Sequence, residues 1–384
     1  MMKILQTIAG FGAHSGGTST CTYDLISALH QQNADVDLLT LASRDVTDKL
    51  MGHGQEWIMA LENDEVTPFG YSKNMSKWLK KRLGNYDVLH TNGLWMYVNH
   101  ATCVWARQQG KPYVITPHGM LYPAALHRSY WKKWPMIQLF FKKDIMNASC
   151  LHVTCRQEMQ FVREFGYKGP VALIANPVVL PTSPCAKRTL KARKAFGFLG
   201  RLHPIKKVEN LFYGDALMGT RQDEFEIWIM GGGLPAYEEF LKSEVKRLGL
   251  KNVKFLGFVN GQEKYERLAQ LSALFVPSDF ENFGMIVTEA LSVGTPVMAS
   301  LGTPWEDLNT YHCGWWKDRK PEDIAEVMKQ VLDMPQEDLD AMGERGNVLV
   351  KEKFASDKVA KQMMELYTWL LHQDSPKPDF VYEL

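Results

Sequence analysis

Short apolar runs alternate with longer helix-like segments along this chain of 384 residues. In its first half we expect strands at residues 3–8, 36–41, 88–90, 113–116, 150–154 and 171–174. In its second half we expect strands at residues 195–199, 226–230, 253–255, 273–276 and 296–299. Apolar strands separated by helices are typical of a parallel sheet that is covered on both faces. The alternation therefore predicts an α/β protein.

Most strands of the first half end in a polar or glycine-containing loop, such as "HTNG", "TPHG", "TCRQE" or "ANPV". Ligands of parallel sheets bind beyond the carboxyl ends of the strands, so we expect these loops to face a ligand.

The stretch "NPVVLPTSPCAKRTLKARK" (residues 176–194) interrupts the alternation with three prolines and a run of cations. This composition is typical of an exposed linker, and the chain is too long for one ordinary core at roughly 150 residues per domain. We expect two Rossmann-like domains, residues 1–180 and 181–359, whose parallel sheets face each other across a cleft.

Composition excludes several classes of protein. The 44 lysines and arginines nearly balance the 43 aspartates and glutamates, whereas a general nucleic-acid binder needs excess cations. No apolar stretch approaches the ~18 residues of a membrane span, and no signal-peptide pattern is present, so we expect a cytoplasmic protein. The six cysteines lack metal-ligand spacing, and we expect buried free thiols at Cys21, Cys103, Cys150, Cys155, Cys185 and Cys313.

The loop "TIAGFGAHSGG" (residues 7–17) joins the first strand to a helix-like segment. A dinucleotide fingerprint needs a third glycine where Ser15 stands, and an acidic residue where the second strand ends in "DLLTLASR". From these residues, three interpretations remain: an NAD site, a tight turn, or glycines that let a phosphate or sugar approach the backbone.

The second half contains "FENFGMIVTEALSVGTPVMAS" (residues 280–300), in which seven residues separate Glu281 from Glu289. The apolar pattern predicts a buried helix containing Glu289, with Glu281 in the loop before it. Free N–H groups near residues 284–286 suit a diphosphate, although spaced glutamates also occur in ordinary acidic helices.

The stretch "GFLGRLHPIKKVENL" (residues 197–211) places Arg201, Lys206 and Lys207 in a loop just after a strand. Such cations suit the neutralisation of a leaving diphosphate; the alternative is a solvated basic loop.

Together these segments resemble the retaining glycosyltransferases of family 4, which have the GT-B fold. "GRLHPIKK" is similar to that family's Gly-Arg-Leu-x-Pro-x-Lys-Gly motif, with Lys207 in place of the final glycine, and "ENFGMIVTE" matches its Glu-x7-Glu motif. The resemblance implies that the first domain binds the acceptor and the second binds a nucleotide sugar. It also implies that the C-terminal residues 360–384 pack back on the first domain.

The resemblance implies a set of site residues. Four would act in catalysis, with the histidine of "TPHGML" beside the donor sugar and acceptor: His118, Arg201, Lys206 and Glu281. The others would bind the donor: Gly16, Gly17, Gly231, Gly232, Phe258, Val259, Asn282, Phe283, Gly284, Met285, Ile286 and Glu289. Taken alone, His118 would be an ordinary histidine at a strand end.

The mechanism that the resemblance implies is a front-face transfer in which a donor phosphate oxygen takes the acceptor proton. Arg201, Lys206 and the helix N-terminus would stabilise the leaving diphosphate, and such electrostatic stabilisation usually contributes most to this kind of catalysis. Neither a metal nor a cofactor is implied, since the nucleoside-diphosphate sugar is a co-substrate.

Aromatic residues and lysines alternate in "YWKKWPMIQLFFKK" (residues 130–143), and "KWLKKR" (residues 77–82) adds a second basic patch. This composition suits an anionic membrane surface; the alternative is a core helix with lysine edges. Membrane association would fit a lipid-linked acceptor in bacterial surface polysaccharide assembly, with the protein at the inner face of the cytoplasmic membrane.

The segment "GTPWEDLNTYHCGWW" (residues 302–316) resembles a variant found among bacterial polysaccharide and lipopolysaccharide glycosyltransferases, and its tryptophans would stack on sugars or fill the core. The sequence thus favours an enzyme that moves a hexose from a nucleotide sugar to a saccharide. The alternative is a catalytically silent nucleotide-sugar-binding subunit of an assembly complex.

Overall fold

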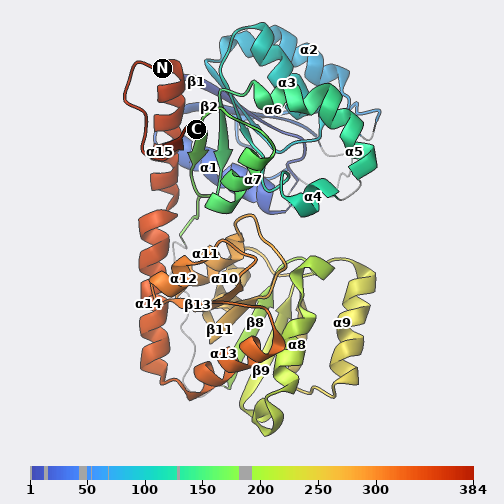
Figure 1. The fold of residues 1–384 in the computed structure, drawn as a ribbon, viewed down its shortest axis with the longest axis vertical. Coiled ribbons are helices and arrows are strands. Elements are labelled where there is room, and N and C mark those ends of the chain that lie inside the picture. Colours follow the sequence, from blue (N-terminus) through green and yellow to red (C-terminus); the bar gives the residue numbers. More distant parts are fainter. Residues whose placement is uncertain are drawn as a thin grey trace. The chain divides into compact units, whose positions relative to one another are not determined.

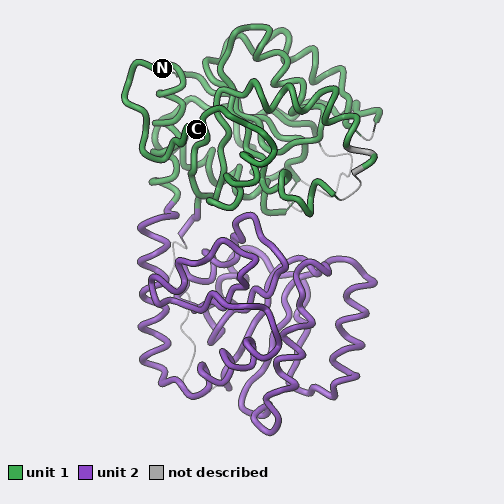
Figure 2. Tube along the Cα trace, viewed as in Figure 1, with its two compact units in different colours: residues 1–177, 356–384 green, residues 178–355 purple. Residues whose placement is uncertain are grey.

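The computed structural model describes residues 2–12, 16–42, 50–52, 54–67, 69–127, 130–180 and 193–384. The chain divides into two compact units (Figure 2). Unit 1 contains Met1–Pro177 together with Ser356–Leu384, and unit 2 contains Val178–Ala355. The chain therefore leaves unit 1 within the proline-containing stretch at residues 176–194, and most of that stretch lies outside the described residues.

Unit 1 is built on one sheet (Figure 1). Among its described residues the sheet has eight strands: β1 (Lys3–Ile8), β2 (Asp35–Leu41), β3 (Ile58–Leu61), β4 (Val88–Asn92), β5 (Tyr113–Thr116), β6 (Cys150–Val153), β7 (Val171–Leu173) and β14 (Val381–Tyr382). Their order is β14-β7-β6-β5-β4-β1-β2-β3. All neighbouring pairs are parallel except β14 with β7.

Helices cover both faces of this sheet. They are α1 (Gly17–Gln31), α2 (Lys73–Arg82), α3 (Tyr97–Gln108), α4 (Pro123–His127), α5 (Tyr130–Met136), α6 (Lys142–Met146), α7 (Arg156–Glu164) and α15 (Ser356–Leu371), with the short turns η1 (Leu83–Asn85) and η2 (Ile137–Phe141). Successive strand residues point to opposite faces, so Ile4 packs with α1 and α15 while Leu5 packs with α2 and α3. This explains why apolar residues occupy successive positions of the strands, on both faces of the sheet.

The last helix, α15, belongs to unit 1 and packs against α1. Its inner face carries the fully buried Val359, Met363 and Leu366, which lie in one cluster with Leu25 and Leu29 of α1. Their spacing of three and four residues is that of one helix face.

Unit 2 repeats the plan with a fully parallel sheet in the order β10-β9-β8-β11-β12-β13. Its strands are β8 (Lys194–Leu199), β9 (Phe225–Met230), β10 (Val253–Gly257), β11 (Ala273–Val276), β12 (Val297–Ser300) and β13 (Gly314–Lys317). Its helical elements are η3 (Pro204–Lys206), α8 (Glu209–Ala216), η4 (Gly219–Glu224), α9 (Pro235–Arg247), α10 (Gly261–Ala269), α11 (Met285–Ser292), α12 (Asp307–Thr310), α13 (Pro321–Asp333) and α14 (Gln336–Lys353).

The core of unit 2 is rich in aromatic residues. Phe196 and Phe198 of β8 and Phe275 of β11 are buried in the cluster formed with α8, α9 and α13. On the other side of the sheet, α11 packs against β11, β12 and α14. The two parallel-sheet units confirm the predicted α/β class.

Three strands were not predicted from the sequence. They are β3, β13 and β14, which lie at the edges of their sheets. All three are short and lie at an edge, where the sheet is covered less completely: β3 ("IMAL") and β13 ("GWWK") have four residues each and are only half-buried, and β14 has just two residues. The predicted strands lie within two residues of their observed ends.

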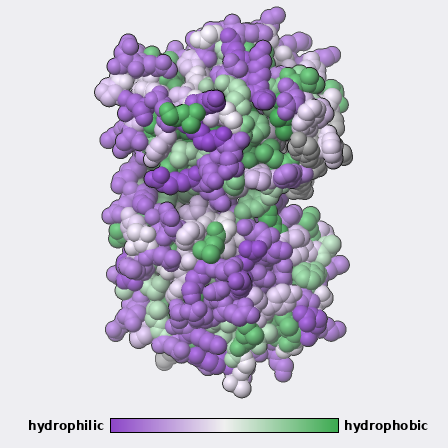
Figure 3. Space-filling view, in the orientation of Figure 1, coloured by the Kyte–Doolittle hydropathy of each residue, from purple (hydrophilic) through white to green (hydrophobic). Residues whose placement is uncertain are grey.

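Among the residues that the structure describes, every helix is too short or too polar to cross a bilayer. The face shown in Figure 3 is mostly hydrophilic, with scattered hydrophobic patches on each unit. Five cysteines are buried and free, as expected: Cys21, Cys103, Cys150, Cys155 and Cys313. Cys185 lies outside the described residues.

Candidate functional site

Lys206 and Glu281 meet in unit 2 at the carboxyl end of its sheet. Lys206 ends η3, in the loop after β8, and Glu281 precedes α11. The Lys206 Nζ lies 2.5 Å from Glu281 Oε1, and Ser278 Oγ donates to the same oxygen at 2.8 Å. Both charged side chains are largely buried, at 19% and 14% exposure, so their pairing is screened less by solvent than a surface pair.

The residue after Lys206 explains how the chain turns there. Lys207 is the C-cap of η3 and adopts a left-handed backbone conformation, with φ 51° and ψ 40°. Glycine reaches this conformation at no steric cost, whereas another residue pays roughly 1–2 kcal/mol. Lys207 thus adopts the geometry that suits the glycine of the similar motif, and its Nζ lies 3.8 Å from Asp279 and 3.9 Å from Glu209.

Arg201 lies in the same loop and is exposed. Among the residues that the structure describes, its guanidinium has no ion-pair or hydrogen-bond partner. A planar cation with five unused donors is suited to an anion that arrives from solution.

The loops after β8 and β9 are joined by backbone hydrogen bonds. Leu202 N–H donates to Gly232 O at 3.0 Å, and Leu234 N–H donates to Leu202 O at 3.0 Å. Gly231 has φ 136°, and a Cβ there would lie 1.9 Å from Gly200 O. A Cβ at Gly232 would meet only Glu238 Oε1, at 3.6 Å. The backbone packing therefore requires glycine at Gly231, whereas Gly232 borders open space.

The helix α11 begins without a side-chain cap. Its N-cap, Gly284, is left-handed with φ 79° and ψ 64° and has no side-chain hydrogen bond at the cap. The predicted residues Asn282, Met285 and Ile286 are partly exposed around it. N–H groups in the first turn of an uncapped helix can bind an anion, helped by the positive end of the helix dipole.

A buried aromatic cluster supports this loop from below. Phe283 is 5% exposed, and its carbonyl accepts a hydrogen bond of 2.6 Å from the indole N–H of Trp305. Trp305 is 1% exposed and packs edge-on against Phe283 and Phe354. The sequence left two roles open for Trp305, and the structure places it in the core. Trp315 and Trp316 of β13 remain partly exposed.

Glu289 lies in the middle of α11 and is buried. Its Oε1 is 2.8 Å from Lys264 Nζ of α10, a partner that the sequence analysis did not identify. In the loop after β10, Phe258 is 64% exposed while Val259 is buried, so only the phenylalanine presents a broad surface.

In unit 1, the glycine loop leads into α1. Gly16 is the N-cap of α1, with φ 87°, and has no side-chain cap. A Cβ on Gly16 or Gly17 would meet no atom of the described residues within 4 Å, so these residues leave space beside the backbone. His14 and Ser15 lie outside the described residues.

His118 follows β5 and has a left-handed backbone, with φ 52°. Its Nε2 lies 3.2 Å from Asn92 Oδ1 at the end of β4. The next residue, Gly119, donates its N–H to the buried carboxylate of Glu158 at 2.6 Å, which holds the turn from the other side. Burial, with the nearby His152, lowers the pKa of His118 to about 3, so the ring is neutral at ordinary pH.

Two further histidines lie in the sheet beneath His118. His90 and His152 are buried, and both contact Thr116 Oγ1, at 2.6 Å and 2.8 Å. Burial lowers the pKa of His90 well below its usual value and that of His152 to about 4. Like His118, these rings are neutral in the folded protein.

The structure thus brings some predicted residues together and adds others. Lys206 contacts Glu281, whereas the partner of Glu289 is Lys264 on α10. Sequence reasoning missed Asn92 and Glu158, although "HTNG" and "TCRQE" had been singled out as strand-end loops.

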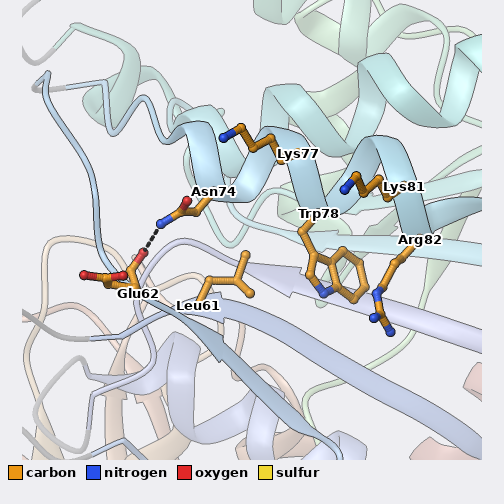
Figure 4. A pocket seen from close by; sticks show the side chains of 7 residues that line it. All are labelled: Leu61, Glu62, Asn74, Lys77, Trp78, Lys81 and Arg82. Atoms are coloured by element: carbon orange, nitrogen blue, oxygen red, sulfur yellow. Dashed lines mark hydrogen bonds between the residues drawn. The ribbon is translucent and has the colours of Figure 1, made fainter.

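Unit 1 also has a shallow pocket between α2 and the end of β3 (Figure 4). Its volume is about 260 Å³, and it is lined by Leu61, Glu62, Asn74, Lys77, Trp78, Lys81 and Arg82. The Asn74 amide donates to Glu62 O at 3.2 Å across its rim. None of the predicted site residues lines it.

We predict opposite results for alanine at two neighbouring glycines. Gly231→Ala places a Cβ against Gly200 O and should lower the free energy of unfolding by about 1–3 kcal/mol. Gly232→Ala should change it by no more than about 0.5 kcal/mol, because the contact of its Cβ with Glu238 Oε1, at 3.6 Å, is an ordinary van der Waals distance. Urea unfolding measures both variants. Equal stability of the two would contradict the packing described here.

We predict that acid destabilises the folded state between pH about 6.5 and 5. In this range an unfolded chain protonates the three rings of His90, His118 and His152, whereas the folded chain, with lowered pKa values, does not. Stability is therefore full above pH about 6.5 and falls as the pH falls, by up to about 1.4 kcal/mol per ring and pH unit. Urea unfolding at pH 7 and pH 5 tests this, and His152→Gln should reduce the slope.

Comparisons with known proteins agree with this architecture. Residues 16–177 match the family model "Glycosyl transferase 4-like domain", and residues 186–348 match "Glycosyl transferases group 1". A D-inositol 3-phosphate glycosyltransferase of Streptomyces scabiei is 25% identical, over 93% of this chain and 87% of the relative. The D-rhamnosyltransferase WbpZ of Pseudomonas aeruginosa is 24% identical, over 77% of each chain.

Among solved structures, HepE of Anabaena, crystallised with UDP and glucose, superimposes with a TM-score of 0.72. The match covers 96% of this chain and 100% of HepE, at 18% identity, and therefore shows a shared fold. Two family models that match most of the chain in succession, relatives that align over 77–93% of it, and this fold lead to one conclusion: the chain belongs to the GT-B glycosyltransferases.

Proposed function

We propose that this glycosyltransferase transfers a hexose from a nucleoside-diphosphate sugar with retention of configuration and without a metal ion. The acceptor is a saccharide or a lipid-linked saccharide in bacterial surface polysaccharide assembly. The observation that carries the proposal is the meeting of Lys206 with Glu281 directly before the uncapped α11.

Positive charge in unit 2 suits a leaving diphosphate. Lys206 supplies a point charge, Arg201 offers a guanidinium that no described residue engages, and α11 adds the positive end of its dipole. Fixed donors of this kind stabilise charge that develops in the transition state without having to reorganise. In this proposal they perform the neutralisation that a divalent cation performs in other transferases.

Glu281 is suited to hold the sugar. Its Oε1 accepts from Lys206 and Ser278, while Oε2 has no partner among the described residues. A carboxylate oxygen is a strong acceptor for a sugar hydroxyl. Because Lys206 balances the charge of Glu281, the carboxylate repels a nearby diphosphate less than an unpaired one would.

The low pKa of His118 supports the front-face route. With a pKa of about 3, the neutral ring is a weak base and is a poor candidate to remove the acceptor proton. A phosphate oxygen of the leaving group then takes this proton on the face where the new bond forms. His118 is left to orient a hydroxyl.

Two relatives support the substrate assignments. WbpZ of P. aeruginosa is named as a D-rhamnosyltransferase, and HepE of Anabaena was crystallised with UDP and glucose. We therefore place UDP-hexoses first in a donor panel that also contains GDP-hexoses.

We predict that Lys206→Ala and Glu281→Ala each lower kcat/KM by about 10²–10³-fold, because each removes a group that stabilises the transition state. Release of the nucleoside diphosphate from the donor panel measures this, and excess EDTA should leave the wild-type rate unchanged. Lys254→Ala is the matched control, since Lys254 forms an exposed ion pair with Glu226 in the same unit.

Unchanged turnover in both site variants would show that the assigned site is wrong. Donor binding by the wild type without turnover of any acceptor would favour the silent-subunit alternative.

We further propose that unit 1 binds an anionic membrane surface. In the segment from α5 to α6, Ile137 and Phe141 are buried, whereas Trp131 and Leu139 are 87% and 70% exposed. Exposed cations follow at Lys142 and Lys143. The segment therefore combines both earlier interpretations: one side packs in the core and the other presents large apolar side chains to solvent.

The helix α2 adds cations to the same unit. Met75 and Leu79 are buried, and the exposed side carries Lys73, Lys77, Lys80, Lys81 and Arg82. Each such cation near an anionic surface contributes about 1 kcal/mol.

We predict that the double variant Trp131→Ala/Leu139→Ala weakens binding to vesicles of phosphatidylglycerol and phosphatidylcholine by about tenfold or more, because both side chains lose apolar burial. Sedimentation with the vesicles measures it. Val348→Ala, at an exposed apolar residue of unit 2, is the control. Equal binding by all three proteins, or none by the wild type, would contradict a membrane role for this segment.

A further inference from the structure

We propose that Asn92, Gln6 and Tyr367 are positioning residues that hold His118 in the tautomer protonated at Nε2. Nδ1 then faces a bound sugar as an acceptor of a hydroxyl proton. The sugar rests on the proposed function, whereas the tautomer is a property of unit 1 and can be measured without any substrate.

The argument starts from a backbone carbonyl, which can only accept a hydrogen bond. Ile174 O lies 2.8 Å from His152 Nε2, so Nε2 of this neutral ring carries the proton. His152 Nδ1 is then an acceptor, and its partner at 2.8 Å, Thr116 Oγ1, must donate to it.

The direction passes from Thr116 to the next strand. The Thr116 hydroxyl donates its only proton to His152 Nδ1. The Thr116 oxygen therefore accepts a hydrogen bond from His90 Nε2 at 2.6 Å. His90 Nδ1 is then an acceptor, and the hydroxyl of Tyr367 donates to it at 2.6 Å.

From Tyr367 the chain of hydrogen bonds continues to His118. Having donated its only proton, the Tyr367 oxygen accepts from Gln6 Nε2 at 3.3 Å. Gln6 Oε1 therefore accepts from Asn92 Nδ2 at 2.9 Å, which turns Asn92 Oδ1 toward His118 at 3.2 Å. His118 Nε2 must then donate to Asn92 Oδ1, so the single ring proton of His118 is on Nε2.

Burial makes this order hard to reverse. Gln6, His90, Thr116 and Tyr367 are fully buried, and Asn92 is 4% exposed. Reversing one hydrogen bond leaves two donors or two acceptors facing each other unless every later group reverses as well. The chain of hydrogen bonds therefore behaves as a unit that ends at His118.

The consequence for a ligand lies at the other ring nitrogen. His118 Nδ1 has no hydrogen-bond partner among the described residues. As an acceptor it favours a hydroxyl and disfavours an unprotonated phosphate oxygen. The left-handed backbone of His118 and the hold of Glu158 on Gly119 fix the ring from the main-chain side.

The test reads the tautomer directly in the free protein. With ring-15N histidine, NMR couplings between ring nitrogens and carbon-bound protons distinguish the two tautomers, and His118→Gln identifies the signal among the 11 histidines. We expect a single Nε2–H form in the wild type. A wild-type His118 protonated at Nδ1 would overturn the proposal.

Two variants break the chain of hydrogen bonds at different points. Tyr367→Phe removes the hydroxyl that accepts from Gln6, so the Gln6 side-chain amide can rotate and exchange its oxygen and nitrogen. The Asn92 amide can then rotate in the same way and present its NH₂ group to His118, so we expect the Nδ1–H form of His118 to appear. Gln6→Met should do the same and serves if Tyr367→Phe does not fold. Persistence of the sole Nε2–H form in the folded variants would overturn the proposal.

Two controls separate positioning from general damage. Asn92→Asp should keep the Nε2–H form, because both carboxylate oxygens only accept. Tyr167→Phe should change nothing, since the buried Tyr167 hydroxyl donates to Ala148 O outside this chain of hydrogen bonds. Loss of the Nε2–H form in either control would count against the assigned order.

Kinetics complete the test once a donor has been found. Tyr367→Phe should lower kcat/KM about tenfold and Tyr167→Phe should not. A changed tautomer with unchanged kcat/KM would overturn the role of Nδ1 toward the sugar. If no donor is turned over, the proposed function fails, while the NMR result still decides the tautomer.

Discussion

The parallel register of the central strands determines where the buried polar side chains of β1, β4 and β5 lie in unit 1. The pairing of β1 with β4 sets Gln6 beside His90, and the pairing of β4 with β5 sets Asn92 beside Thr116. A shift of one residue would turn these polar side chains to the opposite face of the sheet, where they would lie among the apolar residues under α2 and α3. The apolar residues that alternate with them, such as Leu5 and Leu89, keep the register in place because they fill the core under α2 and α3.

In unit 2, close packing of the backbone determines where the site residues lie. The loops after β8 and β9 pair so closely that Gly231 has no room for a Cβ beside Gly200, and this fixes the start of the loop that carries Arg201 and Lys206. Lys207 then adopts a strained conformation that glycine would adopt freely. Such strain persists only where the surrounding structure over-determines it, and it often marks functional sites.

The central strands, the loop after β8 and the loop before α11 could be predicted from the sequence because their signals are local. Apolar runs such as "KAFGFL" need no partner to be recognised, and the loops that follow them carry their own glycines and cations. The contacts of Glu289 with Lys264 and of Gln6 with Tyr367 could not be predicted, because they depend on which helix faces which strand. The polar residues of "KILQTI" and "VLHTN" are visible in otherwise apolar strands, but their partners come from other elements, one of them 361 residues away.

Unit 1 is discontinuous along the chain, since α15 and β14 return to it after the whole of unit 2. During synthesis strands β1 to β7 of unit 1 emerge first, yet the helix that covers α1 and supplies Tyr367 is made only after unit 2. Unit 2 is continuous in sequence, so it can fold before the chain is finished. Unit 1 keeps the apolar surface of α1 exposed until α15 has been synthesised. A nascent chain stalled before Ser356 would therefore contain a folded second unit and a first unit with exposed apolar surface. Exposed apolar surface of this kind is what chaperones bind.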